Sequence, residues 1–221
     1  MQHHLVHYSA FSSKKVAGER RSNAIMKEIE ESNMQKGLLL ILSGPSGVGK
    51  GTVRRYLTMD ESLNLSYSIS MTTRKPRLGE VEGKDYFFTS KEAFEQAIAK
   101  GELLEWAEFV GHYYGTPASY VEKLRQEGRN VLLEIEVQGA MQVQEKVPDA
   151  ISIFMIPPSM EELEKRIRGR GSEPEEIIQE RLAKAEKEMK LVSHYKYVVC
   201  NDDPELAAKY IGLIIEKHRA S

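Results

Sequence analysis

The chain has 221 residues, of which 41% are hydrophobic and 29% are charged, and these proportions exclude a disordered or collagen-like chain. Its 31 basic and 33 acidic side chains give a formal net charge of -2, so any anion site must be built locally and we expect no nucleic-acid partner. No apolar run approaches the roughly 18 residues that a membrane span needs, and the lone Cys200 suits a reducing compartment. We therefore expect a cytoplasmic protein with no membrane partner.

Residues 1–35 differ in composition from the rest of the chain. They are polar and lack the apolar periodicity of a helix that packs on a core. We interpret them as a flexible extension, although the cluster His3, His4 and His7 could bind a metal ion. Residues 36–221 are expected to form one domain.

From residue 38 onward, apolar strand-like runs alternate with helical patterns. The runs typical of strands are 38–42, 131–135, 151–156 and 196–200, and those typical of helices are 52–57, 138–145, 160–167 and 204–217. This alternation predicts an α/β fold, with a parallel sheet core flanked by crossover helices. Within it we expect Cys200 to be a buried structural thiol.

Residues 68–118 interrupt this pattern with aromatic and polar side chains. Strand-like runs at 86–88 and 103–110 flank a helical pattern through Phe94, Ala97 and Ile98. We interpret this segment as a subdomain inserted for substrate binding.

Two capping-box spacings, Ser159 with Glu162 and Ser172 with Glu175, predict two helix starts. The loop between these helices, at 168–172, lies in a segment of about 166–182 that could move as a helical lid.

A glycine-rich loop follows the first strand and precedes a helix, which is the context of a P-loop. Its residues are Gly44, Pro45, Ser46, Gly47, Val48, Gly49, Lys50, Gly51 and Thr52. Backbone N–H groups and the helix N-terminus would face the phosphates of a nucleoside triphosphate, and Lys50 would add a full positive charge. Gly51 stands where a Ser or Thr usually follows the lysine, so Thr52 is the candidate hydroxyl for Mg²⁺. This Lys-Gly-Thr variant is also similar to adenylate kinases, so the loop alone leaves the acceptor open.

Several further motifs, taken in order with the P-loop, closely resemble guanylate kinases over residues 37 to 217. They lie at 68–80, 83–88, 104–107, 113–116, 134–139, 157–159, 169–171 and 201–203. The resemblance implies an enzyme that transfers the γ-phosphoryl group of ATP to GMP, and also to dGMP, with Mg²⁺ as cofactor. ATP and GMP are then the expected small-molecule partners, and the oligomeric state stays open.

The residue types in the insertion suit a nucleoside monophosphate. Arginines and tyrosines offer the cations and hydroxyl donors that a phosphate monoester needs. Guanine presents two donors beside one acceptor, so a selective pocket needs carboxylates and a hydroxyl. With the resemblance, these arguments give the expected GMP-binding residues: Ser70, Arg74, Arg77, Glu80, Tyr86, Glu105, Tyr114, Thr116 and Glu136.

The resemblance also implies roles around the transferred phosphate. Glu134 precedes Glu136 by two residues, so in a strand both would point to one face, and the resemblance places Glu134 near Mg²⁺ through water. The lid arginines are implied to close over the phosphates of ATP. The expected catalytic residues are Lys50, Arg74, Arg166, Arg170 and Arg181, and the expected metal contacts are Thr52 and Glu134.

Two alternatives remain at this stage. The chain could be a guanylate-kinase-like module that binds a peptide and does not catalyse, although such modules usually have degraded phosphate loops. It could also phosphorylate AMP or another monophosphate, as the Lys-Gly-Thr variant suggests.

Overall fold

The computed structural model describes residues 35–169 and 174–220, and the account below concerns the compact unit Lys36–Ser221. The expectations for the extension at 1–34, for its histidines and for Arg170 lie outside the described residues.

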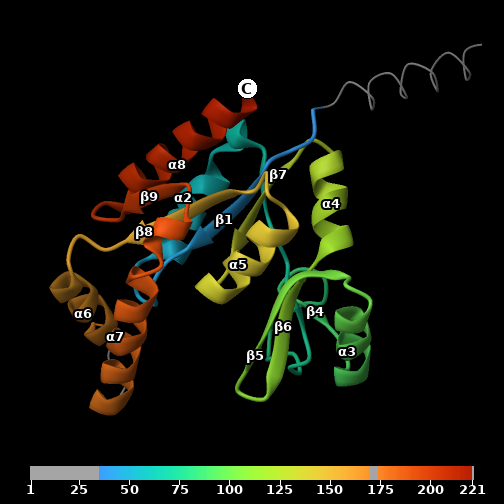
Figure 1. Ribbon diagram of the computed structural model, residues 1–221, viewed down its shortest axis with the longest axis horizontal. Helices are drawn as coiled ribbons and strands as arrows, with labels where there is room; N and C mark the ends of the chain where they lie inside the picture. The colour runs from blue at the N-terminus through green and yellow to red at the C-terminus, as the bar shows by residue number, and fades with distance from the viewer. Residues whose placement is uncertain (1–34, 170–173, 221) are drawn as a thin grey trace, which may run out of the picture. The chain divides into compact units, whose positions relative to one another are not determined.

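The unit is built on a five-stranded sheet in the order β2-β7-β1-β8-β9 (Figure 1). Its strands are β1 (Leu39–Ser43), β2 (Leu65–Tyr67), β7 (Asn130–Glu134), β8 (Ile151–Ile156) and β9 (Tyr197–Cys200). Every neighbouring pair is parallel, and in the central register Leu40 lies between Leu132 and Ile151. The predicted parallel α/β core is confirmed.

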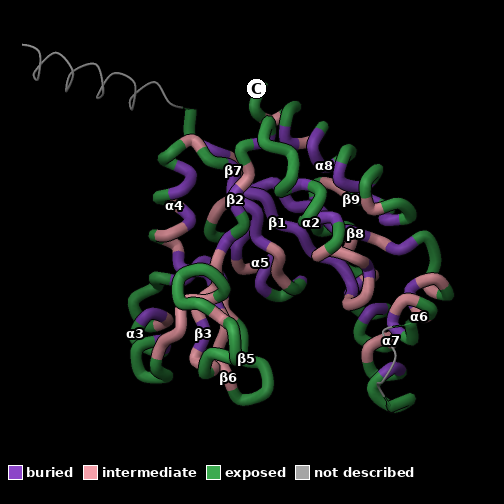
Figure 2. Tube along the Cα trace, turned by 180° about the vertical axis from the view of Figure 1, so that it is seen from behind, coloured by how far each residue is buried: buried purple, intermediate pink, exposed green. Residues whose placement is uncertain are grey.

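The central strand β1 is buried along its whole length because helices cover both faces of the sheet. Leu40 and Leu42 belong to one hydrophobic cluster, whereas Leu39 and Ile41 belong to the cluster on the opposite face. Figure 2 shows the sheet as a buried layer inside mostly exposed helix surfaces.

Helices spread along residues 50–219 complete these two clusters. They are α2 (Lys50–Met59), α4 (Ala118–Gln126), α5 (Val137–Lys146), α6 (Met160–Arg168), α7 (Glu175–Met189) and α8 (Pro204–Arg219), with short 3₁₀ turns η1 (Glu61–Leu63) and η2 (Val192–His194). Side chains of α2, α6, α7 and α8 enter one cluster, and side chains of α4 and α5 enter the other. The two expected lid helices are therefore joined to the same core as the helix that follows the P-loop.

The inserted segment forms a second, four-stranded sheet in the order β4-β3-β6-β5. It consists of β3 (Met71–Thr72), β4 (Phe87–Phe88), α3 (Lys91–Ala99), β5 (Leu103–Phe109) and β6 (His112–Pro117). Its small core is centred on Phe94, Ala97 and Leu103. In Figure 1 this subdomain and the helices α6 and α7 extend from the core as two separate arms.

One local expectation is wrong. Cys200 is exposed, because β9 is an edge strand whose alternation buries Val199 and turns its neighbours outward. The expected cap at Ser172 lies outside the described residues; α7 has Pro174 as its N-cap residue, and the carboxylate of Glu175 accepts from Arg168 at 2.6 and 2.7 Å. The other expected cap is confirmed, since the Ser159 hydroxyl accepts from the backbone N–H of Glu162 at 3.1 Å.

The side chain of Asn130 forms hydrogen bonds that hold the start of β7 in place, and its replacement by Ala should destabilise the fold. Its side chain accepts from the N–H of Leu38 at 2.9 Å and donates to the carbonyl of Leu63 at 2.7 Å, and the residue is 2% exposed. Leaving two buried partners unsatisfied should lower the free energy of unfolding by about 2–4 kcal/mol. Thermal melting of Asn130→Ala beside the exposed Gln126→Ala measures this, and equal melting temperatures would show that water replaces the amide without cost.

Candidate active site

The carboxyl edge of the parallel sheet gathers the chemistry-bearing segments. The P-loop follows β1, Glu134 ends β7, helix α6 follows β8, and Asn201 follows β9. Because parallel strands end at one edge, residues more than 150 positions apart in sequence meet there.

Two glycines of the P-loop adopt backbone conformations that would not be possible with a side chain at either position. Gly44 has φ +147° and Gly49 has φ +98°, a region that favours glycine. A Cβ at Gly44 would lie 2.5 Å from the carbonyl oxygen of Met155, and one at Gly49 would lie 2.4 Å from Nδ2 of Asn201. The loop is therefore held against β8 and the end of β9 by contacts that leave no room for a methyl group.

Lys50 begins α2 and turns back over the loop. Its Nζ donates to the carbonyl of Gly44 at 2.5 Å and to that of Pro45 at 3.3 Å. Burial lowers the pKa of Lys50, and the charges of Glu134 and Glu188 oppose that shift. The ammonium thus sits in a loop of backbone donors at a helix N-terminus, an arrangement suited to binding phosphate.

Two of the three expected lid arginines reach the P-loop region. Arg181 on α7 donates from Nη2 to the Ser46 hydroxyl at 2.8 Å. Arg166 on α6 donates to the backbone carbonyl of Asn201 at 2.8 Å, and the Asn201 side chain donates to the carbonyl of Val48 at 2.7 Å. Asn201 therefore joins the loop to α6, a role that its sequence motif did not reveal.

The two expected metal contacts lie on adjoining elements. Thr52 is exposed in the first turn of α2, and Glu134 ends β7, where its Oε2 is 3.6 Å from Nε of Arg54. Hydroxyl and carboxylate oxygens are the hard ligands that Mg²⁺ prefers, and Mg²⁺ usually takes its other ligands from water and substrate phosphates. Thr52 and Glu134 offer one hydroxyl and one carboxylate of this kind. Among the described residues there is no group of three or more His, Cys, Asp or Glu side chains able to hold a metal.

Glu134 and Glu136 do not share a strand face as expected. β7 ends at Glu134, and Glu136 is the N-cap residue of α5. Both nevertheless line the same cavity.

In the inserted subdomain, Arg74 is held by a carboxylate. Its guanidinium donates two hydrogen bonds to Glu80, at 2.8 and 2.9 Å, and Glu80 also accepts from the backbone N–H of Arg77 at 2.7 Å. The Arg74 side chain is 12% exposed and lies 5.2 Å from the centre of the Tyr86 ring. The hydrogen bonds from Arg74 and Arg77 lower the pKa of Glu80. This forked pairing is the geometry with which arginine also binds phosphate.

A cavity of about 280 Å³ opens between this subdomain and the main sheet. It is lined by Ser70, Glu105, Ala107, Glu108, Phe109, Tyr114, Gly115, Glu134, Ile135, Glu136, Gln138 and Gly139. Five of the expected site residues therefore meet in one place.

Glu105 is the buried acid of this cavity. It is 7% exposed, its Oε1 accepts from the Thr116 hydroxyl at 2.6 Å, and burial raises its pKa. Gly139 leaves the room that it needs, since a Cβ there would lie 2.8 Å from Oε2 of Glu105. A fixed, desolvated acceptor of this kind can select a ligand that brings N–H donors.

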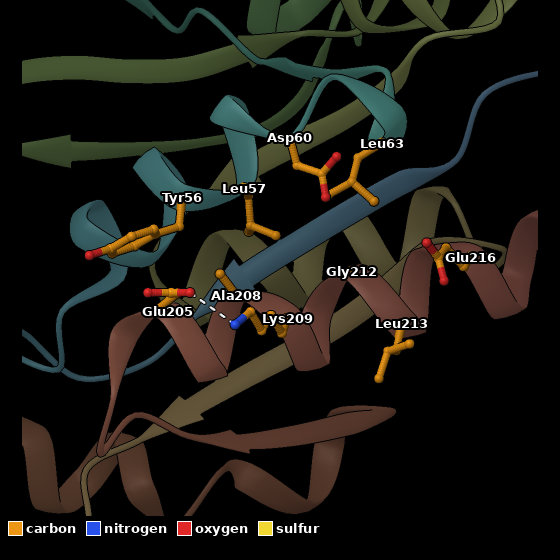
Figure 3. A pocket seen from close by; sticks show the side chains of 10 residues that line it. All are labelled: Tyr56, Leu57, Asp60, Leu63, Glu205, Ala208, Lys209, Gly212, Leu213 and Glu216. Atoms are coloured by element: carbon orange, nitrogen blue, oxygen red, sulfur yellow. Dashed lines mark ion pairs between the residues drawn. The ribbon is translucent and has the colours of Figure 1, made fainter.

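A larger hollow of about 460 Å³ lies elsewhere, between α2 and α8 (Figure 3). Its floor includes Leu57, Leu63 and Ala208, and at its rim Lys209 pairs with Glu205 at 2.9 Å. None of the expected site residues lines it.

The fold and the loop define a P-loop nucleotide-binding protein with a further cavity, lined by Glu105 and Glu136, beside an inserted subdomain. The family model for guanylate kinase matches residues 36–218. A guanylate kinase from Bacillus cereus is 57% identical over 181 residues, covering 82% of this chain and 88% of that protein, and one from Lactococcus lactis is 55% identical over 182 residues with the same coverages. The crystal structure of guanylate kinase from Anaplasma phagocytophilum has a TM-score of 0.66 at 35% identity, covering 85% of this chain and 88% of that one.

The chain therefore belongs to the guanylate kinase family. Within residues 35–169 and 174–220, the structure has no helix of the length and apolarity needed to cross a membrane.

Proposed function

We propose that this member of the guanylate kinase family transfers the γ-phosphoryl group of ATP to GMP, and also to dGMP, giving ADP and GDP or dGDP. The observation that carries the proposal is the pairing of two phosphate-binding devices in one unit, the P-loop with Lys50 and the Arg74 fork beside the Glu105 cavity. A cytoplasmic location is part of the proposal, since the reaction uses nucleotides of that compartment.

The donor side is assigned to residues 44–52 and the lid arginines. Backbone N–H groups of the loop bind the β- and γ-phosphates of ATP, and Lys50 with Arg166 and Arg181 balances the charge that moves between them. Thr52 and Glu134 would hold Mg²⁺, Glu134 through water. Bound with ATP, Mg²⁺ would supply further neutralisation of phosphate charge.

The acceptor side is assigned to the inserted subdomain. Arg74, Arg77 and the tyrosines 86 and 114 bind the phosphate of GMP, whose oxygen is already ionised at neutral pH and needs no general base. The chain's task is to hold donor and acceptor in line and to exclude water. Glu80 accepts two hydrogen bonds from the Arg74 guanidinium and so fixes the position of this cation.

Guanine recognition is assigned to the cavity. Glu105 and Glu136 accept hydrogen bonds from the N1–H and the 2-amino group, and Ser70 or Thr116 donates to O6. Thr116 donates its single hydroxyl hydrogen to Glu105 in the described structure, so in this arrangement it fixes the orientation of that carboxylate and Ser70 is left to donate to O6.

The alternatives raised by the sequence are not favoured. A peptide-binding module has no use for an intact P-loop whose lysine turns back over the loop, and the relatives that match most of the chain are named as kinases for guanylate.

Arg74→Ala and Arg77→Ala should each raise the KM for GMP by about tenfold or more, because a charge-assisted contact to phosphate contributes about 1.5–3 kcal/mol. The affinity of each variant for ATP should stay within about twofold of the wild-type value, since the residues assigned to ATP lie on other elements. Steady-state kinetics with each nucleotide varied in turn measures this.

Lys75→Ala is the matched control, because this lysine lies between the two arginines and is exposed. The assignment of the acceptor phosphate site would be wrong if both arginine variants lost ATP and GMP affinity equally.

A further inference from the structure

Lys184 of α7 lies between two carboxylates that belong to different parts of the unit. Its Nζ is 2.9 Å from Oε2 and 3.1 Å from Oε1 of Glu136, on the rim of the Glu105 cavity. The same Nζ is 3.9 Å from Oε1 of Glu188, one helical turn further along α7. One ammonium is therefore shared unequally between two acids.

Glu188 is an incompletely paired acid. The residue is 9% exposed, and its Oε2 is buried with no hydrogen-bond donor among the residues that the structure describes. Burial raises the pKa of Glu188, and the charge of Lys184 opposes that shift. A buried carboxylate that lacks a donor is costly, so Glu188 would gain from a closer approach of the ammonium.

Glu136 is in the opposite situation. Its side chain is 70% exposed, and both of its oxygens accept from Lys184. An N–H donor that enters the cavity meets a carboxylate whose two oxygens already accept from the ammonium, so its own hydrogen bond to Glu136 is weaker while Lys184 stays in place. Water can solvate Glu136, whereas the buried oxygen of Glu188 has no such replacement.

We propose that Lys184 is a positioning residue that exchanges partners when the acceptor binds. The 2-amino group of guanine donates to the Glu136 carboxylate, and the Lys184 ammonium moves from Glu136 to Glu188. This inference rests on the proposed function, in which Glu136 contacts the base. Lys184 and Glu188 share one face of α7 with Arg181, and Arg181 donates to Ser46 of the P-loop. The exchange therefore connects the presence of an acceptor to the lid helix that contacts the donor site.

The test is GMP binding without ATP, measured by calorimetry on the full chain. Lys184→Met removes the competitor and should tighten GMP binding by about threefold, the effect of a half-exposed ion pair. Glu188→Gln removes the negative charge to which the Lys184 ammonium would move and should weaken GMP binding by about threefold. In the double variant the Glu188→Gln effect should vanish, because no ammonium is left to relocate. Lys187→Met, an exposed neighbour on the same helix, is the control and should bind as wild type does.

A second readout is amide hydrogen exchange along α7. GMP should change the exchange of this helix in the wild type and leave it unaltered in Lys184→Met. A purely structural role for Lys184 would instead weaken GMP binding and lower the melting temperature together, which would overturn the proposal. Equal binding by Glu188→Gln and wild type would overturn it as well. If the wild-type chain bound no GMP, both the proposed function and the partner exchange of Lys184 would be wrong. If the wild-type chain bound GMP but the Lys184 and Glu188 variants did not show the expected affinities, only the partner exchange would be wrong.

Discussion

Lys50→Met should lower kcat by about 10²- to 10³-fold, the usual cost of removing one preorganised charge that stabilises a transition state. Lys50 is the cation inside the P-loop, where its Nζ donates to the carbonyls of Gly44 and Pro45. Charge shifts between phosphates during transfer, so the ammonium acts more strongly on the transition state than on bound ATP. The KM for ATP should therefore change much less than kcat.

The fold of the variant must be shown to persist. Burial lowers the pKa of Lys50, so an uncharged side chain of similar length is tolerated there, and the melting temperature should fall little or rise. Arg55→Met, an exposed change on the same helix, is the control for kinetics. Near-normal turnover by a folded Lys50→Met protein would contradict the assigned donor site.

Glu105→Gln should reduce kcat/KM for GMP by about 10- to 100-fold, because a hydrogen bond to a charged group contributes about 1.5–3 kcal/mol. The amide still accepts from Thr116 and keeps the shape of the site, so the change removes charge and one acceptor only. Use of ATP should be almost unaffected, since the Glu105 cavity lies on the acceptor side.

The loss should fall on GMP and not on AMP. Adenine has an acceptor at N1 and no 2-amino group, so the variant loses a contact that AMP never makes and the preference for GMP narrows. IMP, which lacks only the 2-amino group, should fall between the two. Glu108→Gln, which alters an exposed acid lining the same cavity, should leave the ratio unchanged, and an unchanged ratio in Glu105→Gln would remove this residue from the base pocket.

The sequence predicts the core of this fold well because its signals are local. The all-apolar run at 38–42 and the glycines after it indicate a buried strand and a phosphate loop, and the structure has β1 at Leu39–Ser43 with the loop at its end. The run at 151–156 coincides with β8. Strands buried on both faces give continuous apolar runs that turn residues interrupt clearly.

The parts that were missed depend on tertiary context. The sequence did not indicate β6 or α4, which follow each other directly at Pro117 and Ala118 and show little apolar periodicity. β6 is held in place by its pairing with β5 and β3, and that pairing exists only in the fold. The exposure of Cys200 follows from the edge position of β9, which its own sequence does not reveal.

The site divides in the same way. Residue type and motif indicated Glu105, Thr116 and Arg74, and the structure brings the first two into hydrogen-bond contact. Lys184 was not singled out, and Asn201 appeared only within the motif at 201–203 with no role assigned, since the importance of both comes from helices and strands that meet only in the fold. No periodicity in a charged helix distinguishes Lys184 from the solvated lysines beside it.

The most direct test of the account is a coupled assay that measures ADP formation from ATP and Mg²⁺ with GMP, AMP, UMP or dTMP as the acceptor. The account predicts efficient use of GMP, with kcat/KM for AMP lower by about 10⁴-fold, because a site built on hydrogen bonds to the base rejects an analogue that leaves them unpaired. It predicts similarly poor use of UMP and dTMP. Comparable turnover with AMP and GMP, or no turnover with GMP, would contradict it.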